Sequence, residues 1–285
     1  MKIIGFAQLR NEAKDGFLYR FAESMRVCDT VYVYDQASTD DSHALYKDED
    51  YKVIYGNSNE FFNEMKCKET LLRKILTDHP DADFILWMDG DTILDHRLWD
   101  RHTLEELCGN IGAADHIRFT HYNLWRSDTH YRVDNAFHWL SGIVAPIWKA
   151  KPFLSFGDEY GLHVRNQPMG LEKPSDCQYA LIHHGFAHDQ RLLQRFCSRF
   201  PIMQEAGVSS PWSEVRCIDE STMKVKRIPD NELKQILSPG HRFRDIDPNR
   251  LPRFMAVHQA VIEKTVGTSI VDIYSHLDDW MFKGD

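Results

Sequence analysis

The sequence predicts an α/β fold with a mostly parallel central sheet flanked by helices and with a helical C-terminal segment. As far as Asp91, apolar runs of strand length alternate with stretches whose apolar residues recur at helical spacing. This alternation is typical of parallel strands joined by right-handed crossovers. After about Gly207, five prolines interrupt short helical stretches. We therefore expect a main domain over residues 1–207 and a helical appendage over 208–285 that packs on it.

The expected elements follow from the apolar pattern, taken in chain order. In the first part of the chain, strands are expected at 3–9, 31–34, 51–55 and 84–88. The stretches between them predict helices over 17–28 and 61–76. Further along, we expect strands at 116–125, 142–148 and 179–182 and a helix over 190–205.

The composition indicates a globular protein that does not bind nucleic acid. The 285 residues are 42% hydrophobic and carry a formal net charge of −9, whereas nucleic-acid-binding domains normally present a basic face. The N-terminal residues turn polar too soon for a signal peptide, and no apolar run approaches the ~20 residues of a transmembrane span. The six cysteines form no Cys-x-x-Cys, which argues against a zinc site or a disulfide framework. We expect a soluble, cytoplasmic protein.

The strongest candidate for a site is the end of the expected strand at 84–88. This apolar run leads directly into Asp89-Gly90-Asp91. Open α/β sheets bind ligands at the carboxyl ends of their strands, and two carboxylates there suit Mg²⁺ or Mn²⁺ carrying a phosphorylated substrate. Asp-x-Asp also occurs at 48/50, 81/83 and 245/247. Only the copy at 89/91 directly follows a strand-like run, so the inference depends on this context.

Polar residues also follow the first two expected strands. Arg10-Asn11-Glu12 comes after the first strand, and Asp35, followed by Ser38-Thr39-Asp40, comes after the second. A carboxylate there can accept the imide hydrogen of a uracil or guanine ring, and Arg10 can meet a phosphate. The alternative is that Ser-Thr-Asp-Asp simply makes a turn and caps a helix.

Together the three motifs resemble the family-2 glycosyltransferases and related groups of the GT-A fold, the nucleotide-diphospho-sugar transferase fold. In that family an Arg-Asn-Glu follows the first strand, the second strand ends in Asp before Ser-Thr-Asp, and the fourth ends in Asp-x-Asp. The resemblance covers roughly residues 1–200. It implies a UDP- or GDP-sugar donor, a saccharide or other hydroxyl acceptor, Mn²⁺ or Mg²⁺, and inversion at the anomeric carbon. The donor-binding residues that it implies are Arg10, Asn11, Glu12, Asp35, Ser38 and Asp89.

A fourth match lies at His183-His184-Gly185-Phe186, after the apolar residues 179–182. Several branches of the family have His-Tyr-Gly there, so the resemblance implies a metal- or phosphate-contacting imidazole at His183, with His184 in the place of the aromatic residue. An imidazole is a reasonable ligand for Mn²⁺ and a poorer one for Mg²⁺. With 15 histidines in the chain, a structural role for either is the alternative.

Inverting transfer needs one more carboxylate to take the proton of the acceptor hydroxyl. The best candidates are Asp158 and then Glu159, which lie between Gly157 and Gly161, because glycines allow a loop to approach a ligand closely. Asp134 and His163 compete for this role, and a solvated turn is the alternative. On the acceptor side, the candidates are Trp125 and Trp139, whose rings can stack on sugars, and His163.

Two other functions are compatible with these motifs. A phosphatase of the haloacid-dehalogenase kind also has Asp-x-Asp after a strand, although that motif normally opens the domain and here it follows the fourth strand. The second alternative is a module that binds nucleotide-sugars without turning them over. The sequence contains no GxGxxG and no P-loop motif, and it does not distinguish UDP, GDP and TDP donors.

Overall fold

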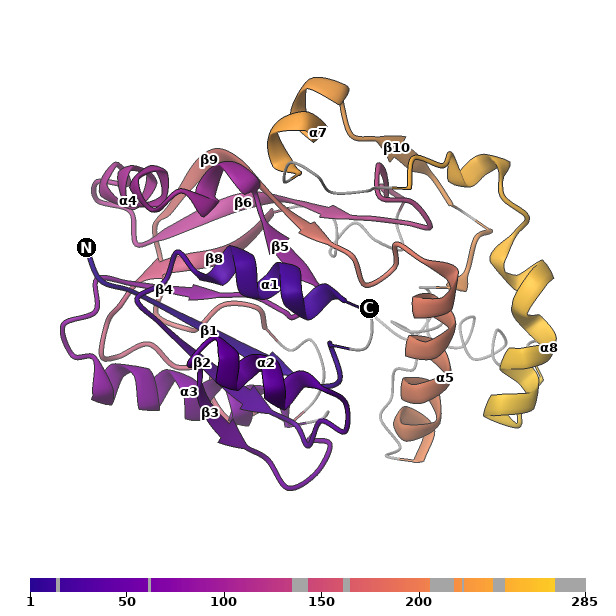
Figure 1. The fold of residues 1–285 in the computed structure, drawn as a ribbon, viewed down its shortest axis with the longest axis horizontal. Helices are drawn as coiled ribbons and strands as arrows, with labels where there is room; N and C mark the ends of the chain where they lie inside the picture. Colours follow the sequence, from indigo (N-terminus) through magenta and orange to yellow (C-terminus); the bar gives the residue numbers. More distant parts are fainter. Residues whose placement is uncertain are drawn as a thin grey trace, which may run out of the picture. The chain divides into compact units, whose positions relative to one another are not determined.

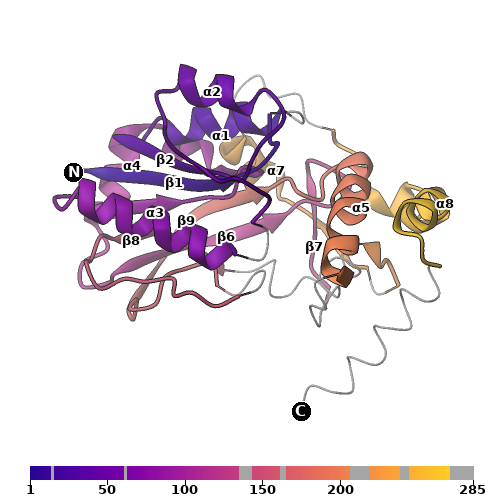
Figure 2. The ribbon, with the colours of Figure 1, turned by 90° about the horizontal axis from the view of Figure 1, so that it is seen from below.

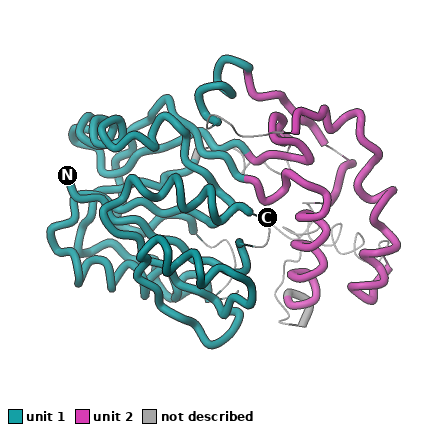
Figure 3. Tube along the Cα trace, in the orientation of Figure 1, with its two compact units in different colours: residues 1–122, 142–183, 230–241 teal, residues 123–141, 184–229, 242–285 magenta. Residues whose placement is uncertain are grey.

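The computed structural model describes residues 1–13, 16–60, 63–134, 143–160, 165–205, 218–221, 223–237 and 244–269. The chain divides into two compact units, which Figure 3 colours separately. Unit 1 comprises residues 1–122, 142–183 and 230–241, and unit 2 comprises 123–141, 184–229 and 242–285. We describe each unit by itself.

The first half of the sheet in unit 1 is parallel (Figure 1). It is built from β1 (Ile3–Leu9), β2 (Thr30–Asp35), β3 (Lys52–Tyr55) and β4 (Phe84–Trp87), in the spatial order β3-β2-β1-β4. Strand β1 pairs in parallel with β2 on one side and with β4 on the other. The connecting helices are α1 (Phe17–Met25), α2 (Ser42–Asp48) and α3 (Glu64–Asp78).

The other half of the sheet continues as β8-β6-β9-β5. These strands are β5 (Thr92–Leu94), β6 (His116–Asn123), β8 (Ile143–Lys149) and β9 (Pro174–His183). Strand β8 runs antiparallel to both β4 and β6, and β5 runs antiparallel to β9. The expected α/β fold with a central sheet flanked by helices is confirmed. The first four strands pair in parallel, whereas β8 and β5 pair antiparallel with their neighbours.

The two faces of the sheet are covered by different helices (Figure 2). Along β1, Ile3, Ala7 and Leu9 join the core beneath α1 and α2, whereas Ile4 and Phe6 join the core beneath α3. This alternation follows from the period of two in a strand. Because both faces are covered, the parallel strands read as continuous apolar runs, which is the pattern that revealed them in the sequence.

The expected elements of the first half are confirmed within a few residues, and the short ones were missed. The expected helix at 61–76 is α3, which begins at Glu64, and residues 61–62 lie outside the described residues. Strand β9 is longer than the expected 179–182. The sequence pattern did not predict the short elements α2, β5, the 3-10 helix η1 (His96–Trp99), α4 (Arg101–Gly109), β7 (His130–Arg132) and β10 (Val225–Arg227).

Unit 2 packs its helices around a separate apolar core. Helix α5 (Asp189–Glu205) contributes Leu192, Phe196 and Phe200 to this core, and α8 (Phe254–Val266) contributes Phe254 and Ile262. The guanidinium of Arg126, 2% exposed, donates to both carboxylate oxygens of Asp189, at 2.6 and 2.7 Å, and to Glu220 at 3.1 Å. A buried charge is tolerated only when it is paired in this way, so Arg126 ties the start of α5 to the segment before α8.

The units interleave along the sequence. The expected division into a domain over 1–207 and an appendage over 208–285 stays a prediction. The compact units follow other boundaries, and the chain passes from one unit to the other near residues 122, 142, 183, 230 and 241. Within the expected appendage, the described elements are β10, α7 (Asp230–Ile236), the 3-10 helix η2 (Pro248–Arg250) and α8. Among the described residues, none of the helices combines the length and the apolar character that crossing a bilayer requires.

Asp115, the residue directly before β6, accepts several hydrogen bonds, and their contribution to the stability of unit 1 can be measured. Burial acts to raise the pKa of its carboxyl, but hydrogen bonds from the backbone of Glu172, from His116, from Lys151 and from the backbone of Lys173 outweigh burial and lower it well below the usual range. Because the folded state has the lower pKa, this stabilisation is present above the unfolded pKa of about 3.9 and is lost as the pH falls below it.

We expect Asp115→Asn to lower the free energy of unfolding at pH 7 by about 1–3 kcal/mol, because donors to the carboxylate are left unsatisfied. Urea unfolding at pH 7 and at pH 3 measures this, and the difference from wild type should shrink at the lower pH. Asp176→Asn is the control, since Asp176 is exposed and paired only with Arg118 in the described contacts, and it should change stability by less than about 0.5 kcal/mol. An equal effect of both variants at pH 7 would contradict the assignment.

Candidate functional site

The polar ends of β1 and β4 meet at the point where the strand order reverses. From β1 the chain proceeds to β2 and β3 on one side, and β4 then lies on the other side of β1. In open α/β sheets, this switch point at the carboxyl ends of the strands is where ligands bind. Arg10-Asn11-Glu12 follows β1, and Asp89-Gly90-Asp91 follows β4 after Met88. The structure therefore brings two of the three sequence motifs together at this position.

Gly90 makes the close approach of these two loops possible. A Cβ atom added to Gly90 would lie 2.6 Å from Leu9 Cδ2 and 2.8 Å from Glu12 Cγ. Any larger residue would have to displace the side chain of Leu9 or of Glu12. The glycine between the two aspartates is thus required by packing, independently of any ligand.

Asp91 lies beside His183, as the pairing of β5 with β9 dictates. Thr92, the first residue of β5, pairs with His183, the last residue of β9. Asp91 therefore falls next to this histidine, and its Oδ1 lies 3.3 Å from His183 Nε2. Both side chains are at least nine-tenths buried. Sequence reasoning joined Asp91 and His183 only through a family resemblance, and the strand register now joins them physically.

A second imidazole, missed in the sequence, adjoins this pair. His121 on β6 has its ring centroid 5.7 Å from that of His183, and β6 neighbours β9 in the sheet. The only sequence signal for it is its place in an expected strand, because the distance between positions 121 and 183 hides their proximity.

Asp89 has an unusual electrostatic environment. Its side chain is exposed, yet the pKa of its carboxyl is raised. The first cause is the protein that surrounds it and displaces water, and the negative charges of Asp91 and Glu64 act in the same direction. The positive charge of Lys68 and, to a lesser extent, that of His183 oppose this rise. The negative charge of Asp91 acting on Asp89 favours a cation beside the two carboxylates.

The residues present fit a divalent metal that the substrate helps to bind. Within the part of the chain that the structure describes, no group of three or more His, Cys, Asp or Glu side chains is arranged to hold a metal by itself. Mg²⁺ commonly uses only one or two protein carboxylates and completes its shell with water and substrate phosphates. Asp89 and Asp91 supply such a pair, and His183 beside Asp91 offers a nitrogen that Mn²⁺ accepts.

The loops after β1 and β2 are joined to each other. Asn11, with a φ of 56°, accepts a hydrogen bond on its side-chain oxygen from Thr39 N at 2.7 Å, and its own N–H donates to Ser38 Oγ at 3.0 Å. Asn11 tolerates this left-handed backbone better than most residues. Asn11 and Ser38 thus fix the geometry of both loops, while Arg10 beside them is exposed.

Asp35 is placed differently from what the sequence suggested. Its side chain has no exposed surface, and Oδ1 accepts from Ser38 N at 2.9 Å while lying 3.2 Å from His43 Nε2. Its Oδ2 accepts from the Tyr46 hydroxyl at 3.1 Å. The expected direct contact of Asp35 with a nucleotide base therefore has no accessible oxygen in this structure. The half-exposed His43 ring, which Asp35 orients, is what faces solvent at this point.

The two candidates for the catalytic base differ in their partners. Asp158 and Glu159 both lie exposed after Gly157, whose φ is 78°. Glu159 accepts two hydrogen bonds from Arg165 Nη2, at 2.5 and 2.6 Å. Because Arg165 occupies both carboxylate oxygens of Glu159, Asp158 is the better placed of the two to accept a proton.

The remaining sequence candidates belong to unit 2 or lie outside the described residues. His184 is 1% exposed, and the competing base Asp134 is buried in an ion pair with Arg132 at 2.7 Å. Trp125 is fully buried in the core of unit 2, so its ring offers no face to a sugar, and we do not carry its acceptor role further. Trp139 and His163 lie outside the described residues.

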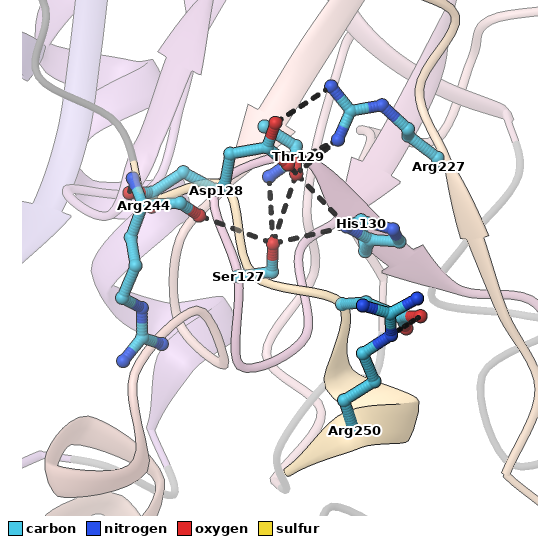
Figure 4. A network of polar contacts seen from close by, with 9 residues as sticks. Ser127, Asp128, Thr129, His130, Arg227, Arg244 and Arg250 are labelled. Atoms are coloured by element: carbon cyan, nitrogen blue, oxygen red, sulfur yellow. Dashed lines mark hydrogen bonds and ion pairs between the residues drawn. The ribbon is translucent and has the colours of Figure 1, made fainter.

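Unit 2 also contains a network of polar side chains, shown in Figure 4. Ser127 Oγ lies at its centre, 3.3 Å from His130 Nδ1 and 3.2 Å from Thr129 Oγ1. Arg227 donates to Thr129 Oγ1 at 3.2 Å. Asp128 N donates to the Arg244 carbonyl at 3.0 Å, and Arg244 N donates to the carboxylate of Asp128 at 2.7 Å. A serine beside a histidine suggests a nucleophile, but Ser127 has no exposed surface. The network is therefore structural.

A substitution at Gly90 tests whether this packing matters for binding. We expect Gly90→Ala to cost about 1–3 kcal/mol of stability and to weaken metal-dependent nucleotide binding, because the new methyl group displaces Leu9 or Glu12. Thermal unfolding with and without UDP and Mn²⁺ measures both effects. The control is Gly109→Ala, since nothing lies within 4 Å of a Cβ added at that position in α4. Unchanged nucleotide affinity in Gly90→Ala would show that the two loops do not act together.

Comparison with known proteins gives structural likeness but no sequence match. No family model and no curated protein matches this chain significantly. Among solved structures, S. aureus TarS 1-349 matches with a TM-score of 0.41 and 13% identity over 69% of this chain and 64% of that chain. Glucosyl-3-phosphoglycerate synthase from Mycobacterium tuberculosis matches with TM-scores of 0.30 in complex with Mn²⁺, UDP and glucosyl-3-phosphoglycerate and 0.31 in complex with Mg²⁺ and UDP. In both complexes of the synthase the sequence identity is 16% over 43% of this chain, and the match covers 44% and 43% of the synthase chain, respectively. This chain therefore spans less than two thirds of the length of each of these matched chains. Structural likeness at these TM-scores supports no conclusion about function. The function is therefore inferred from the residues of this chain alone.

Proposed function

We propose that this protein is a metal-dependent, inverting glycosyltransferase of the GT-A fold, which moves a sugar from a nucleotide-diphosphate donor to a hydroxyl of a saccharide or other acceptor. The observation that carries the proposal is the position of Asp89 and Asp91. They follow a central parallel strand at the switch point of the sheet, packed through Gly90 against the loop after β1. This is where an α/β sheet binds a phosphorylated ligand.

In this proposal, Asp89, Asp91 and His183 hold Mn²⁺ or Mg²⁺. The ion, when bound, neutralises the negative charge that builds up on the leaving diphosphate. The carboxylates supply the charge that keeps a divalent cation in place, and His183, whose Nε2 lies 3.3 Å from Asp91 Oδ1, is close enough to share that cation with Asp91. A chain with a net charge of −9 needs such a local cation to accept an anionic donor.

The loops after β1 and β2 receive the nucleoside in this proposal. Asn11 and Ser38 hold the two loops together, and exposed Arg10 is available to a phosphate. Asp35 acts indirectly, because it orients the Ser38 backbone and the ring of His43. Glu12, half-buried against Gly90, supports the loop that carries the metal-binding pair.

Inversion follows from a single displacement. One carboxylate takes the proton of the acceptor hydroxyl while the nucleoside diphosphate leaves from the opposite face of the sugar. We assign this role to Asp158, with Glu159 as the second choice because it is paired with Arg165.

Asp91 is the most direct test of metal dependence. We expect UDP or GDP to raise the unfolding temperature only when Mn²⁺ or Mg²⁺ is present, because a ligand of the native state stabilises it by mass action. Asp91→Asn should lower metal affinity by more than about 100-fold, since even the groups that support metal ligands contribute 10–100-fold. Asp81→Asn is the matched control, because Asp81 belongs to another Asp-x-Asp and is paired with Lys2. The proposal would be contradicted if the affinity for the nucleotide were the same with added metal, with a chelator and in Asp91→Asn.

The assignment of the base is tested by turnover. Asp158→Asn should lower the rate of sugar transfer by ~10²–10⁴-fold with donor affinity preserved, and Glu159→Gln should have a smaller effect. Initial rates of transfer and the anomeric configuration of the product are the measurements. Near-normal rates in both variants would move the role elsewhere, and a product that retains the configuration of the donor would reject single displacement. Phosphate release from simple phosphate esters would favour the phosphatase alternative instead.

A further inference from the structure

The acidic segment that carries Asp158 and Glu159 is attached at both ends to neighbouring residues of one helix. These are Lys68 and Glu69 in α3, which contact Arg165 and Ser155 at the two ends of the segment. Of this segment, residues 155–160 and Arg165 are described. All of these residues belong to unit 1. Sequence reasoning assigned no role to either helical residue.

Glu69 holds the near end of the segment. Its Oε2 accepts a hydrogen bond from Phe156 N at 2.6 Å and another from Ser155 Oγ at 3.2 Å. Ser155 Oγ in turn accepts from Gly157 N at 3.0 Å. Phe156 itself is fully buried in the core beneath α3. This end of the segment is therefore fixed both by packing and by polar contacts.

Lys68 holds the far end. Its ammonium donates to the backbone carbonyl of Arg165 at 3.2 Å. The guanidinium of the same Arg165 forms an ion pair with Glu159. One hydrogen bond from α3 is thus linked through Arg165 to the acidic pair. The two anchors on α3 are consecutive in sequence, so they bring the ends of the segment close together.

The surroundings of Lys68 show how a buried cation is tolerated there. The residue is only 1% exposed, and an unpaired ammonium would be expensive at such burial. Glu64, one turn earlier in α3, forms a close ion pair with it. Its Nζ also lies 4.3 Å from the ring centroid of Trp87 and 5.8 Å from that of Phe156, distances at which a cation is attracted to an aromatic face.

Trp87 connects this arrangement to the candidate metal site. It is the last residue of β4 and stands two positions before Asp89. Lys68 therefore contacts three places: Trp87 in the strand before the metal-binding pair, Phe156 near the start of the acidic segment, and the carbonyl of Arg165 at its far end. Among the contacts of the described residues, Lys68 is the side chain that joins these three places.

We propose that Lys68 is a positioning residue that, through Arg165, fixes the acidic pair Asp158 and Glu159, and with it the catalytic base, relative to the metal-binding end of β4. This inference rests on the proposed function for its catalytic consequence, but the attachment itself is independent of any activity. A displaced base changes the transfer step without changing the contacts that bind the donor, and a misplacement of about 1 Å can cost a factor of about 10² in rate.

The test compares Lys68→Met with Lys74→Met. Methionine keeps the length of the side chain and removes its charge and donors. Lys74 is the matched control, because it lies in the same helix and pairs with Asp78 at the same i,i+4 spacing but is half-exposed. Since Lys68→Met leaves Glu64 without its partner, the double variant Glu64→Gln/Lys68→Met provides a form in which both charges are removed together. Lys68→Arg, which keeps the charge and the donors, tests rescue.

Two readouts separate attachment from catalysis. The first readout is cleavage by trypsin after Arg165, whose carbonyl oxygen accepts a hydrogen bond from Lys68. Under conditions where the rest of the chain stays intact, this cleavage should be at least about 10-fold faster in Lys68→Met and in the double variant than in wild type. The kcat of sugar transfer should fall by about 10–100-fold in both forms. In the double variant, which removes the opposing charges of Lys68 and Glu64 near Asp89 together, the KM for the donor should change by less than about threefold. Lys68→Arg should recover part of the lost kcat.

The outcomes decide the proposal in both directions. Cleavage after Arg165 and a kcat that both match Lys74→Met would overturn it. Faster cleavage with an unchanged kcat would also overturn the positioning role, since the segment would then move without consequence. If the wild-type protein transfers no sugar from any nucleotide donor, the proposed function fails, and the rate of trypsin cleavage still shows whether Lys68 holds the segment.

Discussion

The site depends on the pairing of β1 with a parallel strand on each side. Because β1 pairs in register with β2 and β4, the residues that follow all three strands come to one edge of the sheet. Leu9 pairs with Asp35, and Phe6 pairs with Trp87. A slip of one residue in either register would turn the side chains that leave the sheet to the opposite face. The polar loops therefore have their places set by the apolar strands before them.

The same constraint explains why small and polar residues alternate at this edge. The loop after β4 approaches the end of β1 so closely that only glycine fits at position 90. The loops after β1 and β2 are tied by Asn11 and Ser38, whose hydrogen bonds take the place of the strand pairing that has just ended. Buried backbone groups must find such partners once the sheet stops, so these residues serve the fold whether or not a ligand is bound.

The sequence was informative where structure is local and less so where it depends on distant pairing. The apolar runs predicted β1, β2 and β4 because strands buried on both faces leave a continuous hydrophobic signal. Strand β5 has only three residues, and α2 begins within a turn-like run of Ser, Thr and Asp, so neither gave a clear period. The antiparallel course of β8 and β9 and the interleaving of the two units arise from contacts between remote segments, which periodicity does not encode.

The site residues divide in the same way. Asp89 and Asp91 were identifiable because they end an apolar run, whereas His121 became apparent only through the neighbouring positions of β6 and β9. Asp35 was correctly placed at the end of a strand, but its complete burial under His43 and Tyr46 depends on α2, which the sequence did not predict. Lys68 was assigned no role from the sequence, since nothing in the sequence places Trp87 and Phe156 around it.

The electrostatics of the site favour a bound cation over the empty site. The surrounding protein, which displaces water, and the charges of Asp91 and Glu64 raise the pKa of Asp89, although Lys68 counteracts them, so keeping Asp89 ionised costs free energy in the protein alone. Lys68 is already engaged by Glu64 and by the Arg165 carbonyl, which limits how far it can offset this cost. A divalent cation between the two carboxylates removes their mutual repulsion and leaves a positive charge for an anionic ligand. In the proposed function, an acidic protein would bind a diphosphate in this way at the edge of the sheet where Asp89 and Asp91 lie.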